Sequence, residues 1–193
     1  MQWIELTATI FGLLCVLLTI RRSIWCWPTG LVQVLLFIIV FYDAKLYSDL
    51  ILHVIYVGMQ LYGWHCWTHP SANQAKLGVF SLPPSHLARW ILVAMVGTLV
   101  WGFSMKTWTD ASLPYADAFT TVTSLIAQYL LARRYVQNWG FWIVVDVVAI
   151  GVYFAKDLHA TATLYAVFLI LATVGWMSWT RELQNQTITE AAV

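Results

Sequence analysis

Gly63-Trp64-His65-Cys66-Trp67-Thr68 is matched 112 positions later by Gly175-Trp176-Met177-Ser178-Trp179-Thr180. Working outward with the same offset of 112, Met1–Thr68 overlies Leu113–Thr180 without a gap, and 15 of the 68 residue pairs are identical. The identical pairs include Trp27 with Trp139 and Arg21-Arg22 with Arg133-Arg134, and chance rarely pairs such residues. An internal repeat in an apolar chain is typical of transporters, in which the substrate site usually lies between the repeats.

The composition is that of a membrane protein. Apolar residues make up 61% of the chain and charged residues 10%, whereas charged residues are about 25% of a typical soluble domain. A chain of 193 residues cannot hide so much apolar surface from water, so the lipid bilayer is its expected solvent. The formal net charge is +1 and there is no basic block, which excludes nucleic acid as a partner.

Patterns of enzymes and metal sites are missing from the sequence. There is no HExxH pair, no Gly-x-Ser-x-Gly elbow and no P-loop, and the three cysteines lack metal-site spacing. We therefore predict that the protein is not an enzyme, that it has no metal or cofactor, and that its own ATP hydrolysis does not drive transport.

Seven apolar segments have the roughly 20 residues that a bilayer-spanning helix needs. They are Trp3–Ile20, Ile24–Tyr42, Tyr47–Trp67, Leu87–Met105, Leu113–Ala132, Val136–Ala155 and Ala160–Trp179. Asn73–Ser85 is the one substantial loop, and the polar residues after Arg181 are expected to be frayed. Because one extra span separates two copies of three spans, both copies have the same orientation and the repeat is parallel.

The predicted fold is thus an all-α membrane protein with seven transmembrane helices in a 3+1+3 parallel repeat. Residues 1–68 form the first three-helix repeat and residues 113–180 the second. Between them, residues 69–112 form a loop and a linker helix at about 87–105, and residues 181–193 form a cytoplasmic tail.

Positive charge is unevenly distributed between the two ends of the predicted spans. One side has seven basic residues, namely Arg21, Arg22, Lys76, Arg89, Arg133, Arg134 and Arg181. The other side has the three lysines Lys45, Lys106 and Lys156 together with most of the carboxylates. Since basic residues favour the cytoplasmic side, we predict that the N-terminus is outside and the C-terminus cytoplasmic.

Asp146 is the one carboxylate well inside a predicted span. It lies 12 residues after Arg134, which at about 1.5 Å per residue is close to the bilayer midplane. Asn138, Trp142 and Asp146 follow one helix face at steps of four, and Trp139 borders that face. A carboxylate beside aromatic rings suits a flat organic cation. The alternative is a polar network between helices that contains Asp146 in neutral or hydrogen-bonded form.

A polar stripe follows the third span at steps of three and four, through His53, Tyr56, Gln60, Trp64 and Trp67. The matching stripe of the second copy is less polar, so we expect the two copies to form unlike halves of one site. Gln33 lies at similar depth in the second span, and Gln128 lies nearer the arginine-rich side. Gln60, Gln33 and Gln128 are candidate ligand contacts, with interhelical hydrogen bonding as the alternative. His53 is interpreted as a packed or gating residue.

Nine of the 12 tryptophans fall into two groups. Amphipathic rings at the headgroup level form a belt in many membrane proteins, and Trp25, Trp67, Trp90 and Trp179 are assigned to such a belt. Five others recur in both copies or lie on the Asp146 face and are candidates for a site or gate: Trp27, Trp64, Trp139, Trp142 and Trp176.

Four patterns together resemble the PnuC family of bacterial vitamin transporters over nearly the whole chain. They are Trp25-x-Trp27-Pro28, Tyr62-Gly63-Trp64-x-x-Trp67, Asn138-Trp139-x-x-Trp142-x-x-x-Asp146 and Gly175-Trp176-x-x-Trp179. The resemblance implies a 3+1+3 fold related to SWEET sugar transporters, a bacterial inner-membrane location and a homotrimer. It also implies facilitated diffusion of an unphosphorylated vitamin, which a cytoplasmic kinase then traps by phosphorylation.

The chain departs from the usual nicotinamide riboside members of the family, because it is short and its Trp25 and Trp27 are two positions apart where three is usual. The family's best-known substrate is nicotinamide riboside, and other members are assigned to thiamine or riboflavin. Asp146 suits the two cationic vitamins, so we expect nicotinamide riboside, with thiamine as the alternative and riboflavin as the least suited. A lipid-modifying enzyme using Asp146 and His53, and a non-transporting assembly subunit, are the alternatives from other classes.

Overall fold

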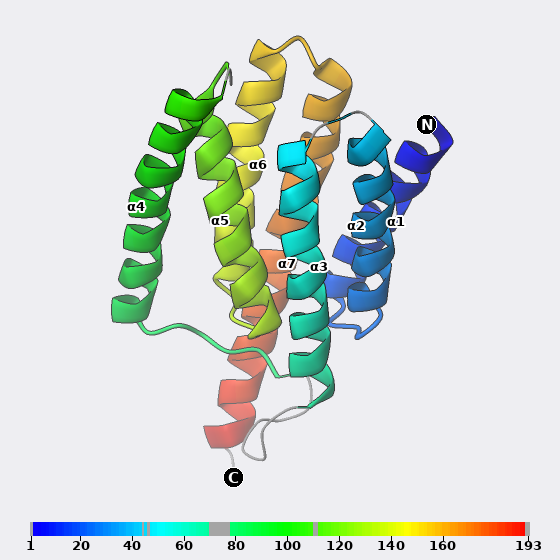
Figure 1. Cartoon of the computed structure of the whole chain (residues 1–193). Helices are drawn as coiled ribbons and strands as arrows, with labels where there is room; N and C mark the ends of the chain where they lie inside the picture. Colours follow the sequence, from blue (N-terminus) through cyan, green and yellow to red (C-terminus); the bar gives the residue numbers. More distant parts are fainter. Residues whose placement is uncertain (1, 44, 46, 70–77, 110–111, 192–193) are drawn as a thin grey trace. The chain divides into compact units, whose positions relative to one another are not determined.

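The protein is built from helices, as the computed structural model shows (Figure 1). The structure describes residues 2–43, 45, 47–69, 78–109 and 112–191. Its helices are α1 (Gln2–Ile20), α2 (Cys26–Asp43), α3 (Tyr47–Thr68), α4 (Pro84–Trp108), α5 (Pro114–Ala132), α6 (Asn138–Ala155) and α7 (His159–Ala191). Within these ranges the one β-type contact is a parallel bridge between Phe80 and Tyr135.

The chain divides into two compact units, residues 1–78 and residues 79–193. In the first unit, α2 packs against both α1 and α3. In the second unit, α5 packs against α4 and α6, and α6 packs against α7. The helix α4, which the sequence indicated as a linker between repeats, therefore packs as part of the second unit.

The two units share helix bounds and turn geometry. Helices α5 and α6 begin and end 112 residues after α1 and α2, and α7 begins 112 residues after α3. Arg22 after α1 and Arg134 after α5 both have positive φ, 54° and 60°. Each starts the same capping turn, in which the next N–H donates to the carbonyl five residues earlier. A left-handed residue other than glycine costs about 1–2 kcal/mol, so the hydrogen bonds of the turn must offset that cost.

A tryptophan seated on a glycine joins two helices in each unit. Trp27 of α2 lies on Gly63 of α3, and Trp139 of α6 lies on Gly175 of α7, where an added Cβ would be 2.6 Å from the indole ring. A second tryptophan meets each ring edge-on, with centroids 5.4 Å apart for Trp27–Trp67 and 5.6 Å apart for Trp139–Trp179. This packing explains why the pattern Gly-Trp-x-x-Trp occurs twice.

The assignment of Trp67 and Trp179 to a headgroup belt is wrong. Their side chains are 2% and 0% exposed, so they lie in the interior of their units and not at a lipid interface. Their spacing in the sequence predicted a position near the arginine-rich side. It could not predict that Gly63 and Gly175 leave space for the rings of Trp27 and Trp139, which pack against Trp67 and Trp179.

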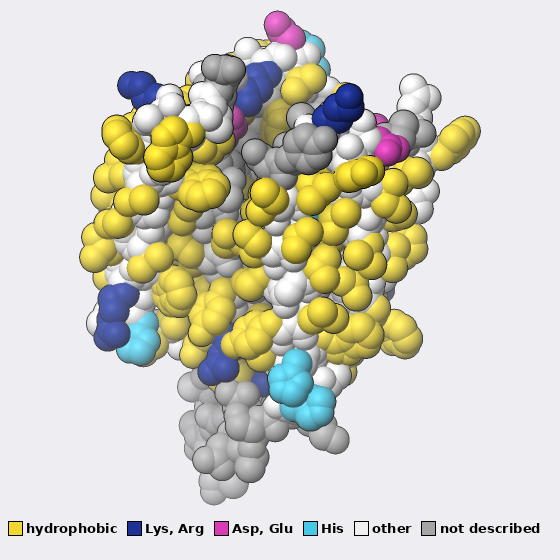
Figure 2. Space-filling view, viewed as in Figure 1, with side chains coloured by type: hydrophobic (Ala, Val, Ile, Leu, Met, Phe, Trp, Pro, Cys, Tyr) yellow, Lys and Arg dark blue, Asp and Glu magenta, His cyan; other side chains and the backbone are white. Residues whose placement is uncertain are grey.

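The helices expose apolar side chains along their length. On the face shown in Figure 2, hydrophobic side chains cover the flanks of the helices and charged ones lie near helix ends. By length and composition, α1, α2, α4, α6 and α7 can each cross a membrane. Helices α3 and α5 are 22 and 19 residues long but carry more polar residues. In α5 three of these residues, Thr123, Ser124 and Gln128, are buried within the unit.

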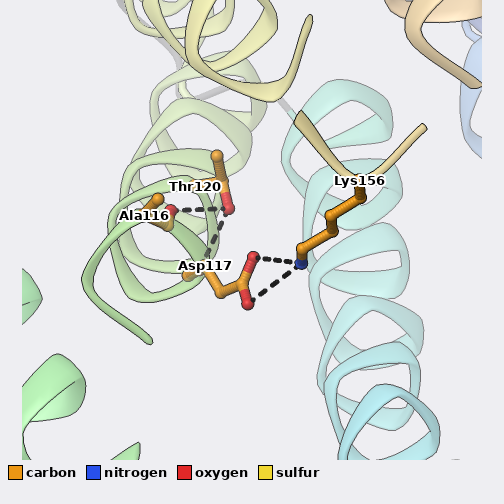
Figure 3. A network of polar contacts seen from close by, with 4 residues as sticks. All are labelled: Ala116, Asp117, Thr120 and Lys156. Carbon is orange, nitrogen blue, oxygen red and sulfur yellow. Dashed lines mark hydrogen bonds and ion pairs between the residues drawn. The ribbon is translucent and has the colours of Figure 1, made fainter. Parts of the chain in front are cut away.

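An ion pair ties the start of α5 to the end of α6 (Figure 3). Lys156 Nζ lies 3.3 and 3.4 Å from the two carboxylate oxygens of Asp117. One turn after Asp117 in α5, the Thr120 hydroxyl donates to the carbonyls of Ala116 and Asp117 at 3.2 and 3.0 Å. Each charged side chain is 30% exposed, so the pair contributes at most about 1 kcal/mol. It places Asp117 and Lys156 at one end of the second unit, opposite Arg133 and Arg134, as their positions in the sequence predicted.

All seven predicted segments are helices, and six of them have bounds within three residues of the prediction. The seventh is wrong at its C-terminal end, because α7 continues from the predicted Trp179 to Ala191 where a frayed tail was expected. The residues after Arg181 include good helix formers and neither Gly nor Pro, so the helix continues into the polar segment. Lys76, Asp110 and part of the predicted loop Asn73–Ser85 lie outside the described residues.

Candidate functional site

Asp146 occupies the middle of α6, eight residues after its first residue and nine before its last. Its side chain is 4% exposed. Within the described part of the chain no group forms a hydrogen bond or ion pair with it, so the predicted alternative of an interhelical polar network has no visible partner. A buried carboxylate without a partner is costly in a membrane and marks a position where a ligand or an ion can compensate.

Asn138 and Trp139 begin the same helix, and both are buried, at 0% and 2% exposure. The Asn138 Nδ2 donates to the carbonyl of Tyr135 at 2.7 Å. Among the described residues, neither Asn138 Oδ1 nor Trp139 Nε1 has a hydrogen-bond partner. An unsatisfied buried polar group costs about 1–3 kcal/mol. One acceptor and one donor are thus left unpaired on adjacent residues.

Trp142 is partly exposed and packs against an apolar cluster from the second unit. The cluster consists of Leu82, Ala94, Ile126, Ala127, Leu130 and Phe141. Trp139 is instead enclosed by α7, so Trp142 is the α6 indole whose ring is part-accessible. Gln128 is buried on α5, at 6% exposure. Trp176 is 37% exposed, and its ring lies against Gly140 of α6.

Two glutamines of the first unit pack their amides against glycines of a neighbouring helix. A Cβ added to Gly12 of α1 would lie 2.8 Å from Gln33 Nε2, and one added to Gly30 of α2 would clash with Gln60 Nε2. The Cys15 sulfur lies beside the same point, 3.0 Å from that added Cβ. Gln60 is 7% exposed, and its Oε1 has no partner among the described residues. The structure thus brings Gln60 into a helix interface but leaves its carbonyl oxygen unpaired.

Trp27 resembles Trp139 in its surroundings. It is 1% exposed, and its Nε1 also lacks a partner in the described part of the chain. Trp64 and Tyr56 are half-buried on α3. Tyr56 meets the ring of His53 edge-on at 5.9 Å.

His53 belongs to an aromatic cluster. Its ring centroid lies 4.8 Å from that of Phe41 and 5.7 Å from that of Phe37. At matching positions of the second unit, Tyr165 contacts Tyr153 at 5.2 Å and Phe168 at 6.1 Å. The packed interpretation of His53 therefore accounts for its contacts.

The candidate residues offer hydrogen bonding, ring stacking and one carboxylate. No group of three metal-ligating side chains occurs among the residues that the structure describes. The sequence patterns did not identify Gly12, Cys15 and Gly30 as neighbours of the polar residues. The spacing could have indicated these contacts. Gly30 follows Trp27 by one helical turn, and Gly63 follows Gln60 by one turn, so each glycine lies on the same helix face as a larger side chain.

Comparison with known proteins identifies one family. The family model described as "Nicotinamide mononucleotide transporter" matches residues 2–181. The chain is 28% identical to the nicotinamide riboside transporter PnuC of Escherichia coli strain K12, covering 93% of this chain and 85% of that one. It is also 28% identical to the riboflavin/roseoflavin transporter RibM of Streptomyces davaonensis, covering 92% and 84%.

A solved structure has the same fold. The crystal structure of the vitamin B3 transporter PnuC aligns with a TM-score of 0.77 and 26% identity, over 95% of this chain and 83% of that one. These proteins are transporters and not enzymes, in agreement with the function class that the sequence predicted.

Proposed function

Because the chain belongs to the nicotinamide mononucleotide transporter family, we propose that it carries an unphosphorylated vitamin across the membrane by facilitated diffusion, with nicotinamide riboside as its substrate. The observation that carries the choice of substrate is Asp146, a buried and unpaired carboxylate in the middle of an apolar helix. A cationic ligand compensates its charge where no side chain of the described structure does so.

The α6 residues have distinct roles in this proposal. Asp146 balances the positive charge of the nicotinamide ring, and the part-exposed Trp142 stacks on its flat face. Asn138 Oδ1 and Trp139 Nε1 supply an acceptor and a donor for an amide or hydroxyl of the ligand. Gln128 and Trp176 complete the ligand contacts from α5 and α7.

The first unit has candidate residues of its own. Its unpaired Gln60 Oε1 and Trp27 Nε1 are one acceptor and one donor, and Gln33, Tyr56 and Trp64 are its other candidates for ligand contact.

Relatives of similar identity to this chain are named for different vitamins. Relatives named as nicotinamide riboside transporters include those of Escherichia coli and Neisseria mucosa, each 28% identical to this chain. The equally similar relative from Streptomyces davaonensis is named for riboflavin and roseoflavin. Riboflavin is neutral and gains nothing from Asp146, whereas thiamine is cationic and is the alternative substrate.

The proposal extends to the cellular setting. All seven helices cross the bacterial inner membrane, with the N-terminus outside and the arginine-rich ends in the cytoplasm. The protein acts as a homotrimer, and a cytoplasmic vitamin kinase traps the transported molecule by phosphorylation.

Uptake into proteoliposomes tests the function. Purified protein should admit labelled nicotinamide riboside faster than protein-free liposomes do. Unlabelled nicotinamide riboside should compete fully, thiamine weakly and riboflavin least. Stronger competition by thiamine or riboflavin would reassign the substrate. Absence of uptake for all three vitamins, with protein shown to be folded and inserted, would favour a non-transporting assembly subunit.

A further inference from the structure

A short extended segment lies along the turn between α5 and α6. We call Val79–Leu82 the strap, and all of it belongs to the second unit. The Phe80 N–H donates to the Arg134 carbonyl at 2.9 Å, and the Val136 N–H donates to the Phe80 carbonyl at 2.9 Å. These two bonds form the one parallel bridge in the described structure. The guanidinium of Arg134 also lies over the Phe80 ring, 5.4 Å from its centroid.

Two glutamine side chains hold the strap at its ends. The Leu82 N–H donates to Gln137 Oε1 at 3.0 Å, and Gln137 Nε2 donates to the Ser81 hydroxyl at 2.9 Å. At the other end, the Gln186 amide pairs with both the carbonyl and the N–H of Val79, at 3.0 and 3.3 Å. Gln186 lies in the part of α7 beyond Trp179. The unexpected extension of that helix is therefore in contact with the strap at Val79.

The matching turn of the first unit has the same internal bonds. The Ser23 N–H donates to the Leu18 carbonyl at 2.9 Å, and the Tyr135 N–H donates to the Leu130 carbonyl at 3.0 Å. Ile24 and Trp25 correspond to Val136 and Gln137 and are 36% and 71% exposed, against 5% for Val136. In the described ranges, no extended segment pairs with Ile24.

The strap meets α6 at the residue before the candidate site. Gln137 directly precedes Asn138, whose amide is fixed by the carbonyl of Tyr135, the residue bridged to Phe80. Asn138, Trp142 and Asp146 lie on one face of the same helix. A rotation of the first turn of α6 would therefore move the whole face.

We propose that Gln137 is a positioning residue, which acts through the strap to hold the first turn of α6 and so fixes the ligand-binding face of that helix. The inference rests on the proposed function for the identity of the ligand. The clamping itself is independent of any ligand.

Amide hydrogen exchange in lipid nanodiscs tests the clamp without a ligand. The reporting N–H groups are those of Tyr135, Asn138 and Trp139, and the matched groups of the first unit are those of Ser23, Cys26 and Trp27, with nearly equal hydrogen-bond lengths pairwise. Exchange at the second-unit groups should be about tenfold or more faster in Gln137→Ala than in the parent protein, in keeping with the loss of two side-chain hydrogen bonds. Exchange at the first-unit groups should be the same in both proteins. The matched change Trp25→Ala should leave exchange at the second-unit groups unchanged. No acceleration at these groups in Gln137→Ala overturns the clamp.

Ligand affinity then tests positioning, with nicotinamide riboside as the probe. Gln137→Ala should raise its Kd by about tenfold. Gln137→Glu keeps an acceptor for both the Leu82 N–H and the Ser81 hydroxyl and should restore both protection and affinity. Faster exchange with unchanged Kd would make the strap merely structural and overturn the positioning role. Failure of the parent protein to bind the probe, with exchange as predicted, would contradict the proposed function and not the clamp.

Discussion

At the scale of single residues, the central feature is a set of buried polar atoms without partners. Asp146, Asn138 Oδ1 and Trp139 Nε1 lie along α6, and Gln60 Oε1 and Trp27 Nε1 lie in the first unit. Such groups cost free energy in the absence of a partner, and more in a bilayer than in water. Under the proposed function, a bound cation offsets this cost at Asp146.

Asp146→Asn tests the charge at the site. The change keeps the shape of the side chain and removes its negative charge. A charge-assisted contact is worth roughly 1–3 kcal/mol, so the affinity for nicotinamide riboside should fall by about tenfold to a hundredfold. Folding should be unaffected, since the variant removes a buried charge that the bilayer disfavours. Calorimetric titration of purified variant and parent gives the comparison, and an unchanged Kd would mean that Asp146 does not face the ligand.

Trp142→Leu tests ring stacking. Loss of the indole face should weaken binding by roughly 1–3 kcal/mol, or about tenfold to a hundredfold. The control is Trp101→Leu on α4, where the indole is 52% exposed and lies outside the candidate site. The same titration should show parent-like affinity for Trp101→Leu. Equal damage in both variants would show a general effect of removing an indole from this protein.

At the scale of helices, each unit relies on a large ring that meets a glycine. Trp27 and Trp139 occupy equivalent positions, and Gly63 and Gly175 leave the space that they fill. Close packing of this kind is a main source of stability between helices in a membrane, where burial from water contributes little. The glycines are therefore expected to be intolerant of even one methyl group.

Gly175→Ala should destabilise the second unit. The new Cβ would lie 2.6 Å from the Trp139 ring, which forces one helix to shift. Overpacking of this kind typically costs about 1–3 kcal/mol. Gly151→Ala on α6 is the matched control, since nothing lies within 4 Å of an added Cβ there. A thermal-shift assay in detergent should show a lower Tm only for Gly175→Ala. A drop of equal size in Gly151→Ala would contradict the role of the indole contact.

The helices could be predicted from the sequence because a bilayer demands long apolar segments, and their bounds follow from polar turns such as Arg21-Arg22. Asp146 could be singled out from the sequence because a mid-span carboxylate stands out in any apolar helix, and its role in ligand binding stays a prediction. The burial of Trp67 and Trp179 could not be predicted, because periodicity places a ring on one face of a helix but does not tell which residues pack against that face. The strap and the extension of α7 could not be predicted either. Ser81, Gln137 and Gln186 are ordinary polar residues, and their hydrogen-bond partners are set by the tertiary structure.

At the scale of the whole molecule, two units of similar build differ in their polar contacts. The first unit has glutamines against glycines, and the second has the carboxylate, the strap and the ion pair between Asp117 and Lys156. The two units nevertheless share their helix bounds and the tryptophan contact.

Membrane topology can be read from single-cysteine labels on a background without Cys15, Cys26 and Cys66. Thr109→Cys follows α4, and Thr189→Cys lies near the end of α7. An impermeant maleimide added to intact cells should label Thr109→Cys, and only disrupted cells should give labelling of Thr189→Cys, because the arginine-rich ends favour the cytoplasm. Labelling of both positions from the same side would contradict the seven-span arrangement.

The endpoint of vitamin uptake tests facilitated diffusion most directly. Proteoliposomes with the membrane potential clamped at zero should take up labelled nicotinamide riboside until the inside and outside concentrations are equal. Imposed pH or sodium gradients should leave that endpoint unchanged, because a uniporter couples the substrate to no second ion. Accumulation above equality, driven by a proton gradient under the clamp, would contradict the account and identify the protein as a proton-coupled carrier.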